Sequence, residues 1–212
     1  MLGLAIHTSS PQLGLMLQSD EEARHQVWDL GRAVSSQMHV KMLEFIAPYQ
    51  WQDLDFIAVA KGPGGFTGTR IGVVAARTLA QQLEIPLFGV SSLAAIAAQR
   101  FSLDRIGTAT DIVITMPAKR ESVYGAIFRF DEKGDLQTLK EEAVVPRAEW
   151  EDAIARWEQD NPSVQRLETD VGAGVANSVT GVMALAAARW NSGQRPNWSS
   201  VMPFYGQHPV HR

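Results

Sequence analysis

The sequence contains no cysteine among its 212 residues. That absence excludes disulfide bonds, thiolate nucleophiles and thiolate metal sites together. It is compatible with a reducing compartment without requiring one, so it restricts the chemistry of the protein more firmly than its location. The composition is otherwise ordinary, and 45% hydrophobic residues are enough to build a sizeable buried core.

Long apolar runs are also missing. No stretch approaches the roughly 20 consecutive apolar residues that a membrane-spanning helix needs. The first residues, Met1–Leu4, lack the basic leader and the cleavage site of a secretory signal. We therefore expect a cytoplasmic protein with no membrane partner.

Excess positive charge is a third absence. The formal net charge is −4, which argues against a free-standing nucleic-acid binder, because such proteins neutralise phosphates with Lys and Arg. Acidic residues crowd the region 141–170, but no Asp or Glu follows Asp170, where only Arg189, Arg195 and Arg212 carry a charge. This cationic end could touch RNA or an acidic partner, although a solvated tail is the commoner use of such a segment.

The order of expected elements is an α/β pattern that runs twice. Apolar alternation, turn residues and capping residues predict the elements of each half. The first half is expected to hold strands at 2–6, 13–17, 23–29, 56–60 and 87–90, and helices from Ser35 or Ser36 to Ile46, over 70–83, and from Ser91 or Ser92 to about Phe101. The second half is expected to hold strands at 112–116, 122–130, 136–145 and 166–169, a helix that places Trp150 and Trp157 on one face, and an Ala-rich helix that ends near Trp190.

In both halves a hairpin, a third strand and a helix follow one another. No sequence repeat of fixed period accompanies this echo, so the duplication is inferred from element order alone. We predict two α/β domains with mixed sheets flanked by helices, over residues 1–103 and 104–212. The sequence leaves open whether the segment after about residue 195 packs on the first domain.

The most informative motif is the glycine-rich run GPGGFTGTRIG at 62–72. It joins the apolar strand at 56–60 to a helix that Thr67 could cap, and such a helix N-terminus attracts anions. The Walker phosphate-binding spacing is not met, and Thr67 stands where the dinucleotide-binding motif needs its third glycine. A tight strand-to-helix turn whose glycines only permit packing is therefore the favoured interpretation, with a phosphate cradle as the alternative.

Four segments together resemble one protein family. They are LAIHTS at 4–9, the glycine run at 62–72, PLFGVSSL at 86–93 and ESVY at 121–124. In order and spacing they are similar to the TsaB (YeaZ) family, densely over the first half and thinly beyond Tyr124. The resemblance implies the actin-like (ribonuclease H-like) ATPase architecture, built from two related domains.

The resemblance also implies a function. Members of this family support threonylcarbamoylation of adenosine 37 in tRNA, as noncatalytic companions of the transferase subunit TsaD and alongside the small ATPase TsaE. We therefore expect an accessory scaffold subunit that contacts tRNA only through the complex. The alternatives are a degenerate nucleotide-binding enzyme related to actin and sugar kinases, or a metallopeptidase, as the wider family has been described.

Catalytic carboxylates are absent where active relatives would place them. Active members of the superfamily carry an Asp near each hairpin turn, whereas this chain has HTS at 7–9 and PAK at 117–119. Magnesium would have no hard oxygen ligand there. We expect no catalytic residue and no cofactor, and we assign a vestigial nucleotide cleft, in which weak nucleotide binding is left open, to Thr8, Ser9, Gly62, Gly64 and Gly65.

Histidine and serine chemistry is weakly supported. His7 could act as a base, but a lone histidine at a strand end is more often a structural donor. No two histidines have the i, i+4 spacing of the metal-binding relatives, and His208 and His211 flank Pro209 near the end of the chain, so no metal is expected. No Gly-x-Ser-x-Gly nucleophile elbow occurs either.

Two helices of the first half carry more apolar surface than one sheet-facing stripe requires. The first has Val40, Leu43 and Ala47 on one side and Met38, Met42 and Phe45 on another. The family pairs through these two helices, with TsaD or with itself, so we predict a homodimer in the absence of TsaD. Pattern alone equally allows all these side chains to pack inside one domain. The predicted interface residues are Met38, Met42, Phe45, Arg70, Val74 and Arg77.

Overall fold

A computed structural model of the chain describes residues 1–101, 109–131, 135–172, 174–204 and 206. Its first sheet has the strand order β3-β2-β1-β4-β5. Strand β2 is antiparallel to both β1 and β3, whereas β4 is parallel to both β1 and β5. The carboxyl ends of β1, β4 and β5 therefore meet at one edge. The strands are β1 Gly3–His7, β2 Gln12–Gln18, β3 Ala23–Asp29, β4 Phe56–Ala60 and β5 Leu87–Val90.

The second sheet repeats the arrangement of the first four strands. Its order is β8-β7-β6-β9, with β6 antiparallel to β7 and parallel to β9. Its strands are β6 Thr110–Pro117, β7 Ser122–Phe130, β8 Leu136–Pro146 and β9 Gln165–Glu168. The predicted class, two related α/β units with mixed sheets flanked by helices, is confirmed.

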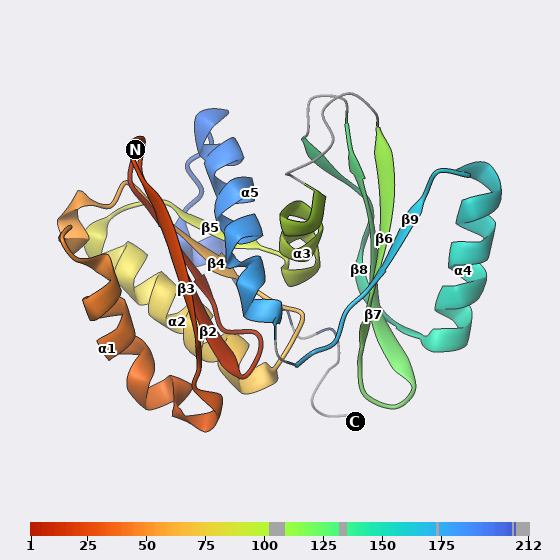
Figure 1. Cartoon of the computed structure of the whole chain (residues 1–212), viewed down its shortest axis with the longest axis horizontal. Helices are drawn as coiled ribbons and strands as arrows, with labels where there is room; N and C mark the ends of the chain where they lie inside the picture. Colours follow the sequence, from red (N-terminus) through yellow and green to blue (C-terminus); the bar gives the residue numbers. More distant parts are fainter. Residues whose placement is uncertain (102–108, 132–134, 173, 205, 207–212) are drawn as a thin grey trace.

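The helices form layers around the two sheets (Figure 1). On the outer face of the first sheet lie α1 (Val34–Ile46) and α2 (Phe66–Leu83), and on the outer face of the second lies α4 (Arg147–Asp160). Between the sheets lie α3 (Ser92–Phe101) and α5 (Val179–Asn191). Short 3-10 helices lie at 31–33, 51–53, 175–178 and 198–200. No helix in the described ranges has both the length and the hydropathy of a membrane span.

The two central helices are exchanged between the halves. Apolar residues of α3, among them Leu93 and Ala97, pack with Ile112 and Phe128 of the second sheet. Residues of α5 pack with the first sheet, in a core that includes Ala5, Phe56, Phe88, Val182 and Met183. A boundary at 103/104 separates the two sheets, while α3 packs on the second sheet and α5 on the first.

The C-terminal segment also lies against the first half. The Leu87 N–H donates to the Pro196 carbonyl (3.2 Å) and the Phe204 N–H donates to the Lys61 carbonyl (2.7 Å). Val201 is buried in the core beneath α1 and α2. The part of the chain that packs on the first half therefore begins with α5, before residue 195.

The helix starts differ from the sequence-based expectations in two of three cases. Neither Ser35 nor Ser36 caps α1, which begins at Val34 without a side-chain cap. Thr67 does not cap α2 either, because the helix already starts at Phe66 and Gly65 is its N-cap residue. For α3 the prediction is confirmed, since Ser91 Oγ accepts from the N–H groups of Leu93 (3.2 Å) and Ala94 (3.4 Å).

The two tryptophans of α4 share one face of the helix, as predicted, and the structure turns that face to the second sheet. The Trp150 indole N–H donates to Thr115 Oγ1 (2.8 Å), and the Trp157 indole N–H donates to Asp111 Oδ2 (3.1 Å). Because each buried or half-buried indole finds a polar partner on β6, the helix is held in one register against the sheet.

Candidate functional site

The glycine loop follows β4 at the carboxyl edge of the first sheet. Gly62 and Gly64 have φ angles of 99° and 153°, which favour glycine, whereas Gly65 has an ordinary φ of −61°. The sequence left open which of Gly64 and Gly65 needs the special conformation, and the structure assigns it to Gly64.

The turn between β1 and β2 packs directly into this loop. Ser9 O accepts from the Gly65 N–H (2.7 Å), and Thr8 Oγ1 donates to the Gly68 carbonyl (2.8 Å). A Cβ atom at Gly64 would lie 2.2 Å from Ser9 O, and one at Gly68 would lie 2.1 Å from Thr8 O. The predicted cleft residues Thr8, Ser9, Gly62, Gly64 and Gly65 are thus brought together, but as a packed contact in which Thr8 and Ser9 are fully buried.

Two buried carboxylates of the second sheet are already engaged. Glu142 of β8 lies 3.7 Å from Lys61, which follows β4, and it also interacts with Ser91; burial raises the pKa of Glu142. Asp111 lies at the end of β6 opposite the second hairpin turn, where it pairs with Arg129 (Nη2 to Oδ2, 2.9 Å). Among the described residues, these contacts are structural links between elements.

His7 is buried at the end of β1 and is held by a single short-range contact. Its Nδ1 accepts from the Ser9 N–H (3.3 Å), and its Nε2 has no hydrogen-bond partner among the described residues. Burial lowers the pKa of His7 from 6.5 to about 3. The ring is therefore neutral at physiological pH and acts as an acceptor at Nδ1, which corrects the expectation of a structural donor.

This burial predicts a pH dependence of stability. Between pH 6.5 and about 3 the unfolded chain binds a proton at His7 that the folded chain excludes. The free energy of unfolding therefore carries no penalty from His7 above pH 6.5. Below that pH the penalty grows by up to about 1.4 kcal/mol per pH unit. Urea unfolding of the wild type and His7→Asn across this range should show a shallower loss in the variant. Parallel curves would contradict the assignment.

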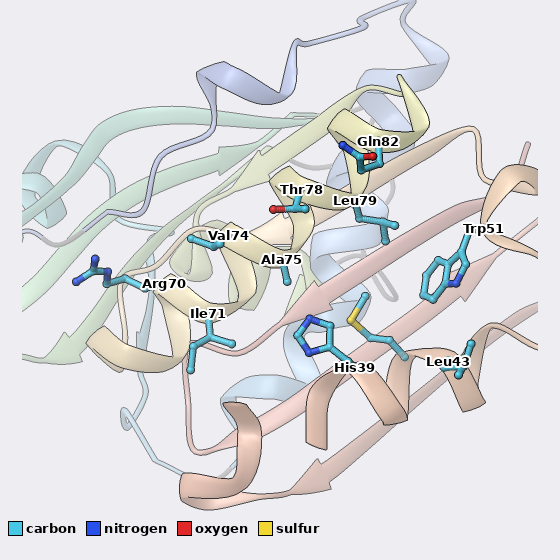
Figure 2. Close-up of a pocket in the computed structure, with 11 residues that line it drawn as sticks. His39, Leu43, Trp51, Arg70, Ile71, Val74, Ala75, Thr78, Leu79 and Gln82 are labelled. Carbon is cyan, nitrogen blue, oxygen red and sulfur yellow. The ribbon is translucent and has the colours of Figure 1, made fainter. Parts of the chain in front are cut away.

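The second candidate region is an apolar groove between α1 and α2 (Figure 2), with a volume of about 670 Å³. Val74 of α2 is 60% exposed and Leu43 of α1 is 63% exposed, although both are large and apolar. The groove is lined by His39, Met42, Leu43, Trp51, Arg70, Ile71, Val74, Ala75, Thr78, Leu79 and Gln82. Four of the five large apolar side chains that are exposed in the described residues lie on these two helices, namely Val40, Leu43, Phe66 and Val74.

The structure reverses the expected sides of α1. Met38 (0% exposed) and Phe45 (9%) belong to the core between α1 and the first sheet, and Met42 reaches only the floor of the groove. The outward side is the one that carries Val40 and Leu43. Sequence spacing identified two apolar sides but could not tell which one the sheet covers, because that depends on how the helix is rotated on the sheet.

On α2 the predicted residues are divided. Arg70 and Val74 line the groove. Arg77 lies on the other flank of the helix, where its guanidinium is 5.6 Å from the centre of the Trp198 ring and donates to Met202 Sδ (3.1 Å). The roles of Phe66, Trp51 and Met202 in this surface were missed, because nothing in their local sequence distinguishes an exposed aromatic or Met from a buried one.

Comparison with known proteins identifies the family. A family model described as TsaD, tRNA N6-adenosine threonylcarbamoyltransferase, matches residues 41–182. The tRNA threonylcarbamoyladenosine biosynthesis protein TsaB of Bacillus subtilis (strain 168) is 35% identical over 162 residues, which cover 75% of this chain and 67% of that protein. The chain belongs to the TsaB (YeaZ) family. The TsaB protein of Escherichia coli (strain K12) is 37% identical over 93 residues, 44% of this chain and 39% of that protein.

Solved structures show the same fold as this TsaB-family chain. A crystal structure from Pseudomonas aeruginosa, described as an uncharacterized protein with similarity to peptidase YEAZ, has a TM-score of 0.75 and covers 97% of this chain and 99% of its own. YeaZ from Pseudomonas aeruginosa has a TM-score of 0.73 and covers 96% of this chain and 99% of its own. Both are 22% identical to this chain, so the similarity concerns the fold alone. The similarity to a peptidase is a description of the first of these two proteins.

Proposed function

We propose that the chain is a noncatalytic scaffold or activator subunit for threonylcarbamoylation of adenosine 37 in tRNA. In this proposal it binds a TsaD-like transferase through α1 and α2. The observation that carries the proposal is the apolar groove, because it gathers exposed large apolar side chains that a soluble monomer rarely leaves open to water. The biosynthetic role named for the Bacillus subtilis and Escherichia coli relatives supports the choice of partner.

The assembly follows from the same surface. A TsaD-like subunit would cover the groove, and in its absence a second copy of the chain would cover it as a homodimer. A TsaE-like ATPase would join the larger complex, and tRNA would be contacted only through that complex. No cofactor is assigned to the chain.

Filling of the glycine loop supports the noncatalytic role. The backbone of Thr8 and Ser9 lies against Gly64 and Gly68, and the Ser9 carbonyl already accepts the Gly65 N–H, so this part of the loop is occupied by protein where a phosphate would have to bind. The hairpin turns supply no Asp to hold magnesium at this place. Developing charge on a transferred phosphoryl group would find no compensating cation there.

The competing function is a degenerate nucleotide-dependent enzyme. We expect the isolated chain to hydrolyse MgATP no faster than buffer, measured as phosphate release from a highly purified sample. It should likewise cleave no peptide substrate. Steady ATP turnover that is lost on Thr8→Val would favour the enzyme over the scaffold, whereas weak nucleotide binding alone would not.

The experiment that tests the proposal directly is association with TsaD. Purified chain and purified TsaD from the same organism are mixed and analysed by size-exclusion chromatography with light scattering. The proposal expects one species with the mass of a complex, formed at the expense of the homodimer. Separate elution of the two proteins at micromolar concentrations would contradict it.

A further inference from the structure

The exposed side of α2 is the centre of a surface wider than the groove. On one flank the groove separates α2 from α1, as Figure 2 shows. On the other flank Arg77 contacts Trp198 and Met202 of the C-terminal segment. Met202 is the fifth exposed large apolar residue of the described chain. Four of the five, Leu43, Phe66, Val74 and Met202, therefore lie on α2 or beside it, and the surface continues from α1 to the C-terminal segment.

Two arginines stand on this surface with their guanidinium groups already placed. Arg70 lies 5.4 Å from the centre of the Phe66 ring, and Arg77 lies over Trp198. Neither has a carboxylate within ion-pair distance among the described residues, whereas Arg129 pairs with one carboxylate and Arg166 with two. An aromatic ring beneath a guanidinium limits its motion and does not occupy its N–H donors. Arg77 gives one of its five N–H donors to Met202 Sδ, and the others can bind an acid.

We propose that Arg70 and Arg77 are specificity-determining anchors that each receive a carboxylate of the transferase partner. The inference rests on the proposed function and adds the chemistry by which the partner is chosen. The arginines are seven residues apart on one helix, so their attachment points lie about 10 Å apart along its axis. The matching acids of the partner should have a similar separation, with apolar side chains between them to meet Val74.

A protein partner suits this surface better than RNA. The arginines are separated by exposed Val74 and bordered by exposed Phe66 and Met202, whereas phosphate-binding surfaces are polar and densely basic. The net charge of −4 also opposes phosphate binding. Guanidinium groups pair with carboxylates through two parallel hydrogen bonds, which sets both register and orientation.

The contact with the C-terminal segment gives Arg77 its position. Trp198 supplies the ring beneath the guanidinium, and the Met202 sulfur accepts a hydrogen bond from Arg77 Nη1. Trp198 is thus a positioning residue, and its replacement by Ala should weaken binding only in a chain that still carries Arg77. In an Arg77→Gln background the same replacement should have little further effect.

The test is the affinity for purified TsaD as a function of salt. Arg70→Gln and Arg77→Gln remove the charge and keep a polar side chain, and Arg156→Gln on α4 is the matched control on an exposed helix of the other half. Each anchor variant should bind about 5- to 30-fold more weakly at low salt. The double variant should also lose most of the decline in affinity that the wild type shows between about 50 and 300 mM NaCl.

Each outcome decides between distinct accounts. Val74→Ser should weaken binding while the salt dependence persists, which separates apolar contact from charge. Anchor variants that bind as the wild type does would overturn the anchor assignment and leave the proposed function standing. Weaker binding with an unchanged salt dependence would also overturn the anchor assignment. Such a result would show that the aliphatic parts of the arginine side chains contribute to binding and that their charges do not. Failure of the wild type itself to bind TsaD would overturn the proposed function together with the anchors.

Discussion

Val74→Glu and Leu43→Glu are expected to leave the chain folded and to lower its affinity for TsaD at least about 30-fold, or roughly 2 kcal/mol. Both side chains are more than half exposed in the free chain, so a carboxylate there costs little in folding. In the complex the same carboxylate would be desolvated without a partner. Calorimetric titration with purified TsaD measures the affinity, and thermal melting confirms that the variants are folded.

Two further variants make this result specific. Ala155→Glu adds the same charge at an exposed position of α4 and should bind normally. Met42→Glu, by contrast, places a carboxylate at a buried position and should unfold the first half instead of giving a folded monomer. Normal TsaD binding by both Val74→Glu and Leu43→Glu would show that the surface is wrongly placed.

Gly64→Ala is expected to lower the free energy of unfolding by about 3 kcal/mol, because two penalties coincide. The φ angle of 153° is one that L-residues rarely adopt, and the new Cβ would lie 2.2 Å from Ser9 O. Gly65→Ala is the matched control, since its φ is −61° and the nearest atom, Ser9 O, is 3.6 Å from the added Cβ. It should change stability by less than about 0.5 kcal/mol.

Urea denaturation of the three proteins measures the difference. Equal midpoints for Gly64→Ala and Gly65→Ala would mean that the β1–β2 turn does not hold the loop as described. Reduced TsaD binding by Gly64→Ala is expected only to the extent that the protein unfolds, because the loop lies outside the groove.

The strands were the most predictable part of the fold. The edges of β3, β4, β5 and β7 were predicted to the residue, because their apolar or alternating runs are bounded by turn residues. The starts of α1 and α2 were less predictable, since neither helix has the side-chain cap on which a sequence-based start depends. At the start of α2 the Gly65 N–H donates to the carbonyl of distant Ser9, and α1 follows directly from the 3-10 helix at 31–33.

Features that join distant segments could not be predicted. The exchange of α3 and α5 between the sheets depends on which apolar faces meet, and Gly181 shows how close they come, because a Cβ there would lie 1.9 Å from Ala95 O. The contact of Thr8 and Ser9 with the glycine loop also joins segments that are far apart in the sequence, so it could not be predicted either. The spacing of glycines shows that something approaches the backbone closely but cannot say whether it is a phosphate or another part of the chain.

The candidate interface was predicted at the level of helices and only partly at the level of residues. Arg70 and Val74 are exposed as expected, while Met38 and Phe45 are core residues. The error follows from the breadth of the apolar arc on α1, because either side could have faced the sheet. A helix with two apolar sides identifies an interface without identifying its outward residues.

The central claim is that the chain acts through its α1–α2 surface and performs no catalysis at its glycine loop. The measurement that tests it most directly is the threonylcarbamoyladenosine content of tRNA in cells that depend on this chain, determined by mass spectrometry after nucleoside digestion. Ser9→Ala, whose hydroxyl has no partner among the described residues, should restore the modification as fully as the wild type, and Val74→Glu should not. Loss of the modification with Ser9→Ala but not with Val74→Glu, at equal protein levels, would contradict the account.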